Sequence, residues 1–190
     1  MDFLNWINGI DFAILDFIQE TIRCDFLDYI MAFFSRIGEA GAIWITSAAI
    51  MLFFKKTRAM GVTLLFAMSL SFIVGEIGLK NIICRPRPYI TNHLMDPLIS
   101  PPSGYSFPSG HSSSSFAAAL VIFVKNKKLG IPALIIASLI AFSRLYNYVH
   151  CPTDVLCGAL LGIVCAVIVL AVFKRTGLEQ GLSGKVKKKV

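Results

Sequence analysis

The sequence predicts an all-α integral membrane bundle of five transmembrane helices, preceded by an N-terminal amphipathic helix that lies in the membrane interface. Of the 190 residues, 56% are hydrophobic and 15% are charged, and the mean hydropathy is +0.72. A soluble domain is about 45–50% apolar and about 25% charged. Several apolar stretches also reach the roughly 17–25 residues that a spanning helix needs. The composition excludes a disordered chain, a collagen-like fibre and a small disulfide scaffold, and the length predicts one membrane-embedded domain, residues 1–190.

Residues 1–36 form the amphipathic N-terminal part. Apolar residues recur at helical spacing over the first 22 positions, with Asp11, Asp16 and Glu20 between them. A helix with one apolar and one acidic face is typical of a segment that lies in the interface rather than across the membrane. Residues 25–36 are expected to continue as a second helical piece that leads into the first span. The alternative is a bundle of six transmembrane helices.

Five apolar stretches are the expected spans: 37–54, 60–79, 109–124, 129–149 and 153–173. Between the second and the third, residues 80–111 form a long polar loop that holds six of the eight prolines. Loops of this length in a compact protein are usually functional or disordered. Because this one is rich in chemically specific residues, we expect it to be an extracytoplasmic active-site loop.

The net charge of +7 is distributed unevenly along the chain. Three basic clusters follow the first, third and fifth spans and hold twelve of the 18 Lys and Arg residues. With five spans, all three clusters lie on one side, which the positive-inside rule makes cytoplasmic; this side includes the basic tail, residues 177–190. Residues 1–28 carry six acids and one arginine, which suits an extracytoplasmic N-terminus. The charge therefore predicts topology in the plasma membrane and requires no nucleic-acid partner.

Three cations are expected to meet on the extracytoplasmic side. Lys80, Arg87 and Arg144 have no equal supply of nearby acids, since Asp154 and Glu76 are the nearest candidates. Charges at this depth are costly unless they are paired or functional. An arginine fork matches phosphate oxygens, and lysine adds a point charge. The three side chains therefore predict a binding site for a phosphate-like anion.

Ser109 and Gly110 stand at the start of the third span and extend this phosphate site. Ser109 is a favourable N-cap residue, so the N–H groups of Gly110 and His111 point out of the helix. Such a helix end binds phosphate through its amides and its dipole. Gly110 also allows an anion to approach the backbone closely.

His150 and Asp154 stand at the start of the fifth span. Pro152 suits the first helical position, so Asp154 falls at the third, from which its carboxylate can hold an imidazole N–H. The other nitrogen of His150 is then free to attack, and His111 can protonate the leaving oxygen. We predict phosphoryl transfer through a phosphohistidine. No metal and no cofactor are expected, because the cations stabilise the phosphoryl oxygens.

These residues resemble the motifs of the type 2 phosphatidic acid phosphatase superfamily, which also includes vanadium haloperoxidases. The family pattern is K-x6-R-P, then P-S-G-H, then S-R-x5-H-x3-D, and all three occur in order from Lys80 to Asp154. The resemblance implies a helical bundle, a lipid-phosphate or polyprenyl-pyrophosphate substrate, a metal-free mechanism and the residue roles given above. The chain departs from the pattern at Cys151, where relatives often have an aromatic residue, and many relatives have six spans.

Two charged residues near the motifs have other expected roles. Arg85 lies outside the family pattern, and we expect it to make a surface or headgroup contact. Glu76 precedes Lys80 by four residues on a helix, and we expect an ion pair that positions Lys80. The serines at 112–115 are expected to form hydrogen bonds within their own helix.

The predicted function is a membrane phosphatase whose amphiphilic substrate keeps its tail in the bilayer and its headgroup at the outer surface. Undecaprenyl pyrophosphate is the preferred substrate, because carrier-lipid recycling is needed on that face. Phosphatidylglycerophosphate and phosphatidic acid are the alternatives. A non-catalytic lipid-phosphate transporter or binder would not need two placed imidazoles, and the expected spans argue against a haloperoxidase. The sequence carries no signal for an oligomeric state.

Overall fold

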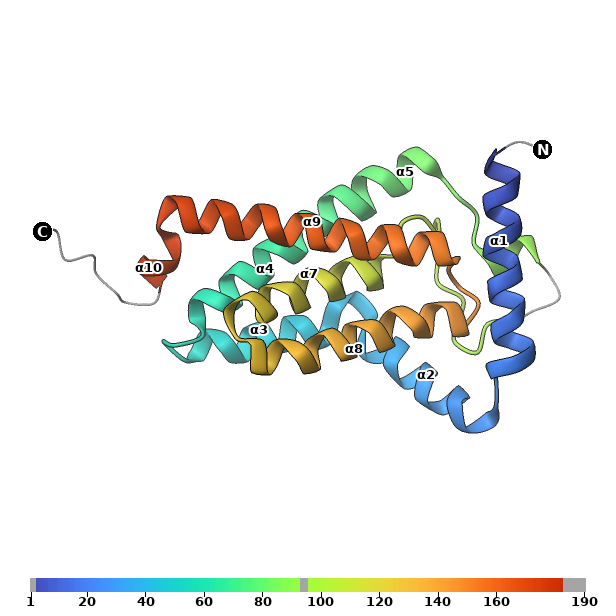
Figure 1. Ribbon diagram of the computed structural model, residues 1–190, viewed down its shortest axis with the longest axis horizontal. Coiled ribbons are helices and arrows are strands. Elements are labelled where there is room, and N and C mark those ends of the chain that lie inside the picture. Colours follow the sequence, from blue (N-terminus) through green and yellow to red (C-terminus); the bar gives the residue numbers. More distant parts are fainter. Residues whose placement is uncertain (1–2, 93–95, 183–190) are drawn as a thin grey trace, which may run out of the picture.

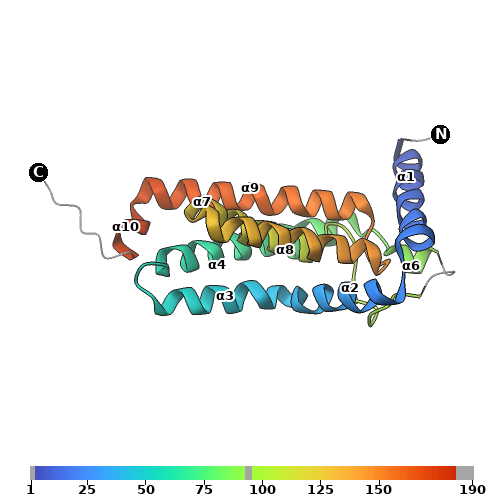
Figure 2. The same ribbon diagram turned by 60° about the horizontal axis from the view of Figure 1, so that its bottom comes forward.

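The computed structural model of this chain describes residues 3–92 and 96–182, and those residues form helices and connecting loops without a β-strand. The long helices run side by side along one axis, while α1 (Phe3–Phe17) lies across one end of the bundle (Figures 1 and 2). The all-α class is thus confirmed. Of the expected basic tail, residues 183–190 lie outside the described part of the chain.

The elements that follow α1 are η1 (Ile18–Ile22), α2 (Asp25–Ile37), η2 (Glu39–Gly41), α3 (Ala42–Phe53), α4 (Arg58–Phe72), η3 (Ile73–Leu79), α5 (Lys80–Ile83), α6 (Pro88–Thr91), α7 (Gly110–Lys125), α8 (Lys127–Tyr146), α9 (Pro152–Thr176) and α10 (Leu178–Leu182). Their ends follow local sequence signals. Asn126 is the N-cap of α8, and its side chain accepts hydrogen bonds from the N–H groups of Lys128 and Leu129. Gly177 is the C-cap of α9 and adopts the left-handed conformation that favours glycine.

Three stretches are long and apolar enough to cross a membrane: Arg58–Thr91, Lys127–Tyr146 and Pro152–Thr176. A fourth is present if the bent pair formed by α2 and α3 is one span. The expected third span corresponds to α7, which has only 16 residues and extends about 24 Å. This helix packs against α4, α8 and α9, so protein surrounds much of it. By length and composition the described residues thus contain three or four candidate spans, and the expected count of five stays a prediction.

The first expected span, 37–54, is not one straight helix. Ala40 and Gly41 have φ values of 50° and 70°, which interrupt the helical hydrogen-bond ladder. The chain bends by 50° between α2 and η2–α3. The α3 helix has only 12 residues, so it reaches a spanning length only together with α2.

The second span continues beyond its expected end at residue 79. The α4 helix passes through the π-helical η3 into α5 and ends at Cys84, which has a φ of 50°. The polar loop therefore begins four residues later than the expected 80–111, and Lys80 lies on a helix. The small residues Gly75 and Gly78 lie within η3.

Close packing between α7 and α9 sets the position of the functional site. A Cβ atom added to Gly162 would lie 2.1 Å from the carbonyl oxygen of Ser113, and one added to Gly158 would lie 2.5 Å from that of Ser109. Small residues at four-residue spacing allow such backbone contact between membrane helices. The approach brings the starts of the two helices together, and the N–H of Ser109 donates to the carbonyl oxygen of Asp154 at 3.0 Å.

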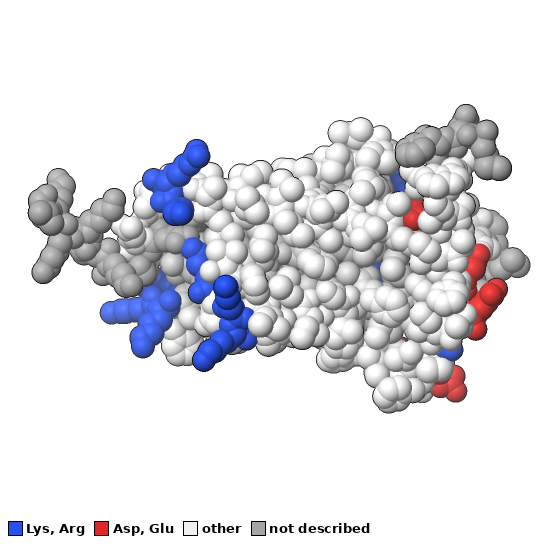
Figure 3. Space-filling view, viewed as in Figure 1, with Lys and Arg blue, Asp and Glu red and all other residues white. Residues whose placement is uncertain are grey.

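The outer surface of the bundle is apolar, and its charges gather at the two ends. In the view of Figure 3, Lys and Arg cluster at the end that contains the α7–α8 turn and the end of α9, and acids cluster at the α1 end, with an uncharged band between. On α9, Leu156, Leu160 and Val164 are 52–62% exposed. Large apolar side chains facing outward around an uncharged band suit a lipid surrounding.

Candidate active site

A cavity of about 650 Å³ lies between the α2–α3 bend, α4 and the start of α7. Six of the eight predicted site residues line it: Lys80, Arg87, Gly110, His111, Arg144 and His150. Much of the remaining wall is apolar and comes from α3, α4 and η3: Ile45, Leu65, Met68, Phe72, Ile73 and Ile77. Because Leu65 lies in α4 and Lys80 only at the start of α5, beyond η3, the charged and the apolar side chains occupy different ends of the cavity.

Lys80 is held by the expected ion pair. Its Nζ lies 2.7 Å from both carboxylate oxygens of Glu76, one helical turn earlier. Glu76 also lies against the start of α7, because a Cβ added to Gly110 would meet its Oε1 at 2.2 Å. The absence of a side chain at Gly110 thus makes room for an acidic group beside the α7 N-terminus. This packing places Lys80, Glu76 and the α7 N-terminus on the same side of the cavity.

Arg87 is fixed by backbone oxygens from two loops. It donates to the carbonyl oxygens of Ser103, Gly104 and Val149 at 3.0–3.1 Å. Its Nη1 is also 3.2 Å from Nε2 of His150. Since a guanidinium can only donate, this contact requires an unprotonated Nε2 on His150. Arg87 therefore has a fixed position at the charged end of the cavity and favours the His150 tautomer with the proton on Nδ1.

Arg144 is the most enclosed of the three predicted phosphate-binding cations. Its side chain is 2% exposed, and its Nη1 donates to the hydroxyl of Ser35 on α2. Its Nε has no hydrogen-bond partner within the described part of the chain, so this donor is free to bind a ligand in the cavity. Among residues 3–92 and 96–182, no group of three or more His, Cys, Asp or Glu side chains is arranged to hold a metal ion.

Ser109 and Gly110 begin α7 as expected, but only Gly110 lines the cavity. The Ser109 oxygen accepts hydrogen bonds from the N–H and the hydroxyl of Ser112, at 3.4 and 3.0 Å, and its side chain is fully buried. Ser109 therefore serves as the helix N-cap, and its predicted direct contact with phosphate stays a prediction. Hydroxyls of Ser113 and Ser114 bond to carbonyl oxygens one turn earlier in α7, as expected.

His150 and Asp154 lie together at the start of α9. Pro152 occupies the first turn, and the Asp154 Oδ2 accepts the N–H of Cys151 at 2.8 Å. The same oxygen lies 3.7 Å from Nδ1 of His150. This distance is too long for a hydrogen bond, although the carboxylate is on the side of the ring that an orienting group must occupy. Burial, together with the cations of Arg144 and Arg87, lowers the pKa of His150 from its ordinary value of 6.5 to about 3.

His111 is the second imidazole in the cavity wall. It follows Gly110 in the first turn of α7, and its Nε2 is buried without a hydrogen-bond partner among the described residues. Buried polar atoms in native proteins are usually paired, so an unpaired one in a cavity wall indicates a group reserved for a ligand. The two imidazoles thus line one cavity, His111 from the first turn of α7 and His150 from the loop between α8 and α9. Cys151 is buried, and burial raises the pKa of its thiol to about 12, so it is a packing residue.

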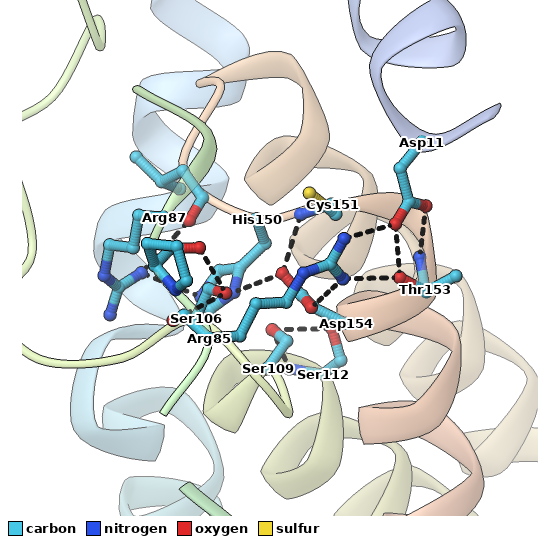
Figure 4. A network of polar contacts seen from close by, with 12 residues as sticks. Asp11, Arg85, Arg87, Ser106, Ser109, Ser112, His150, Cys151, Thr153 and Asp154 are labelled. Carbon is cyan, nitrogen blue, oxygen red and sulfur yellow. Dashed lines mark hydrogen bonds and ion pairs between the residues drawn. The ribbon is translucent and has the colours of Figure 1, made fainter. Parts of the chain in front are cut away.

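Arg85 does not make the expected surface contact, while the expected headgroup contact stays a prediction. Its guanidinium lies between two carboxylates rather than at the surface: Nη1 is 2.7 Å from Asp154 and Nη2 is 2.7 Å from Asp11 of α1 (Figure 4). The sequence contains one signal for this network. Asp11 lies on the same helical face as Leu15 and Ile18, which are buried. An acid on the buried face of an amphipathic helix indicates that it has a charged or polar partner inside the protein.

Comparisons with known proteins agree with the motifs. The sequence pattern of the PAP2 superfamily matches residues 60–177. A relative from Sulfolobus acidocaldarius, named undecaprenyl-diphosphatase, is 35% identical over 140 residues, which are 72% of this chain and 66% of the relative. The chain thus spans about two thirds of that relative's length.

Two solved structures resemble the fold. The crystal structure of Aquifex aeolicus LpxE has a TM-score of 0.76 and 29% identity, covering 85% of this chain and 95% of that one. The transmembrane PAP2-type phosphatidylglycerolphosphate phosphatase from Bacillus subtilis has a TM-score of 0.73 and 28% identity, covering 90% of this chain and 88% of that one. Since the two structures cover 85% and 90% of this chain, the similarity extends along most of the helical bundle.

Proposed function

This chain belongs to the PAP2 superfamily, and on that premise we propose that it is an integral membrane phosphatase that hydrolyses an amphiphilic phosphate. The observation that carries the proposal is the two-ended cavity. Its charged end presents Lys80, Arg87 and Arg144 to an anion, and its other end is lined by apolar side chains of α3, α4 and η3. A soluble phosphate would leave the apolar end unused, whereas a lipid phosphate would occupy both ends.

The proposed reaction begins with attack of the His150 Nε2 on phosphorus. A P–N bond forms, the P–O bond to the leaving group breaks, and His111 donates a proton to the leaving oxygen. Water then attacks phosphorus, a new P–O bond forms as the P–N bond breaks, and His111 takes up a proton from the water, so that inorganic phosphate leaves and His150 returns to its neutral form. Two contacts support this role of His150. The Arg87 Nη1 lies 3.2 Å from the His150 Nε2, which must therefore be unprotonated, and the Asp154 carboxylate lies on the Nδ1 side of the ring. The three cations and the α7 amides would stabilise the phosphoryl oxygens.

For the substrate, we propose undecaprenyl pyrophosphate. The name of the Sulfolobus acidocaldarius relative supports this choice. The Bacillus subtilis structure carries a different name, phosphatidylglycerolphosphate phosphatase, at 28% identity, so that phospholipid is the alternative to be measured beside it. Both compounds combine a phosphate ester with long apolar chains, as the cavity requires.

We also propose five spans, with the active site on the extracytoplasmic face. The spans would be the bent α2–α3 pair, the helix from α4 to α5, α7, α8 and α9. The support is the separation of charge along the bundle (Figure 3). The basic end would face the cytoplasm by the positive-inside rule. With this placement α1, which lies across the other end, would rest in the outer interface.

The test is release of inorganic phosphate by detergent-solubilised protein without added metal, with undecaprenyl pyrophosphate, phosphatidylglycerophosphate and phosphatidic acid compared in parallel. We expect His150→Ala to lower kcat by more than about 10³-fold, because the nucleophile is lost. Cys151→Ser is the matched control, since it changes the adjacent buried side chain and keeps a polar atom at the start of α9.

Three outcomes would contradict the proposal at different levels. Equal release by the parent and His150→Ala would exclude the phosphohistidine mechanism. Release that is fastest with a phospholipid would replace the polyprenyl substrate. Tight binding of lipid phosphates without turnover by the parent protein would favour a transporter or binding protein.

A further inference from the structure

A charged network joins α1 to the proposed catalytic pair. Arg85 donates from Nη1 to the Asp154 Oδ1 at 2.7 Å and from Nη2 to the Asp11 Oδ2 at 2.7 Å (Figure 4). Both carboxylate side chains are almost fully buried, at 0% and 1% exposed. Residues from three distant parts of the chain therefore share one buried set of charges.

Asp11 also contacts the first turn of α9 directly. Its Oδ1 accepts the N–H of Thr153 at 3.0 Å, and its Oδ2 accepts the Thr153 hydroxyl at 2.5 Å. Arg85 contacts the same hydroxyl from Nη1 at 2.7 Å. Thr153 immediately precedes Asp154, so α1 holds the turn of α9 from which the orienting carboxylate projects.

Further contacts tie α1 and η1 to the loop that carries His150. Asp16 accepts the hydroxyl of Tyr148 at 2.8 Å, and the Gln19 amide donates to the carbonyl oxygen of Tyr146 at 2.8 Å. Leu15, with no exposed surface, packs against Tyr148 and Cys151. The N-terminal segment thus contacts the chain on both sides of His150.

Arg85 has a physical role that a surface contact would not have. One Asp154 oxygen already accepts the Cys151 N–H and faces His150 at 3.7 Å. The other oxygen is held by Arg85. A buried carboxylate that loses its cation is left with an uncompensated charge, and it can rotate toward other donors or draw a proton closer. Either change would alter how Asp154 orients His150.

We propose that Asp11 and Arg85 are positioning residues for the phosphatase reaction, which hold the Asp154 carboxylate toward His150 and make α1 a working part of the active site. This inference rests on the proposed function. It assigns no substrate contact to either residue. Its distinctive consequence is that changes in a helix outside the bundle alter turnover rather than substrate binding.

The test uses Arg85→Gln, Arg85→Lys, Asp11→Asn and the double variant Asp11→Asn/Arg85→Gln in the full-length protein. Arg58→Gln is the matched control, because Arg58 also makes a hydrogen bond, to the carbonyl oxygen of Leu52 at 3.0 Å, but stands at the start of α4, at the opposite end of the bundle from α1. Phosphate release gives kcat and KM, and thermal unfolding in detergent gives the stability of each variant.

We expect Arg85→Gln to lower kcat about 10- to 100-fold with little change in KM, in the range seen when a supporting contact to a reactive group is lost. Arg85→Lys should retain more activity, because it keeps the cation. Since both residues act through Asp154, the double variant should be no worse than the more impaired single variant. The control should match the parent.

A second measurement does not depend on turnover. The chain has only three histidines, so the titration of His150 can be followed by NMR with ¹⁵N-labelled histidine. Its ring also lies near the cations Arg87 and Arg144 and the carboxylate of Asp154. Loss of the Arg85 cation removes one positive neighbour, so Arg85→Gln should raise the pKa of His150 relative to the parent. The acid limb of the kcat/KM profile should then shift to higher pH.

Two results would overturn the inference. One is a raised KM with unchanged kcat in Arg85→Gln, which would make Arg85 a headgroup ligand. The other is a loss of activity that follows the loss of thermal stability, with an unaltered His150 titration, which would leave the network with a structural role only. If the parent itself releases no phosphate, the proposed function fails, and the His150 titration still decides whether Arg85 acts on the pair.

Discussion

Adding a single methyl group where α7 and α9 touch should disturb both stability and catalysis. In Gly162→Ala, the new Cβ would lie 2.1 Å from the carbonyl oxygen of Ser113 and 2.9 Å from the N atom of Ala117. Both neighbours are backbone atoms of a helix, so neither can rotate away as a side chain would. Ordinary contact begins at 3.4 Å, and α9 must therefore move outward by about 1.3 Å.

This displacement sets the expected magnitude. Overpacking of a tight core costs about 1–3 kcal/mol, which lowers the Tm by roughly 2–12 °C for a chain of this size. The movement also separates Ser109 from Asp154, whose backbone hydrogen bond at 3.0 Å joins the starts of the two helices. A misplacement of about 1 Å between catalytic groups can lower the rate about 10²-fold.

The assay is thermal unfolding in detergent together with kcat/KM for phosphate release. Gly158→Ala should show a smaller Tm loss, because its closest contact is 2.5 Å, and a larger activity loss, because that contact is with Ser109. Gly181→Ala is the control, since no atom lies within 4 Å of its Cβ position. An unchanged Tm and unchanged activity in Gly162→Ala would refute the argument that α7 and α9 meet through backbone contact at this point.

Two further predictions concern pH and topology. Because the pKa of His150 is lowered to about 3, the neutral imidazole should persist as the pH falls below 6.5. The acid limb of kcat/KM, corrected for ionisation of the substrate phosphate, should then lie below 6.5, and a limb at or above that value would contradict the burial of His150. Cys24 and Cys84 are exposed near the active-site end, so a membrane-impermeant maleimide added to intact cells should label them. Lys127→Cys in a background without those two cysteines should stay unlabelled, and the reverse pattern would invert the proposed orientation.

The parts of the site that could be predicted from the sequence are those coded by local spacing. The N-cap at Ser109, the first-turn positions of Pro152 and Asp154, and the ion pair between Glu76 and Lys80 each depend on residues within four positions of one another. The rules for helix ends and for i,i+4 neighbours apply directly to such spacing.

The parts that could not be predicted depend on tertiary contacts. Arg85 meets Asp11 and Asp154 across separations of 74 and 69 residues, and no local pattern records those pairings. The bounds of α7, by contrast, agree within one residue with the expected 109–124, although its packing against α4, α8 and α9 could not be read from hydropathy. The break at Ala40 was missed because alanine favours helix, and only the tertiary structure imposes its positive φ.

The two sides of α9 differ in how many amino-acid substitutions they tolerate. Gly158, Gly162 and Ala166 follow one another at four-residue intervals on the buried side, where Ala166 has no exposed surface. Leu156 and Leu160 lie on the side that is more than 60% exposed. On that outer side, one apolar residue can replace another at little cost, since lipid adapts to its shape. On the inner side, only the smallest residues fit against the backbone of α7. One helix thus has a face that tolerates many substitutions and a face that tolerates almost none.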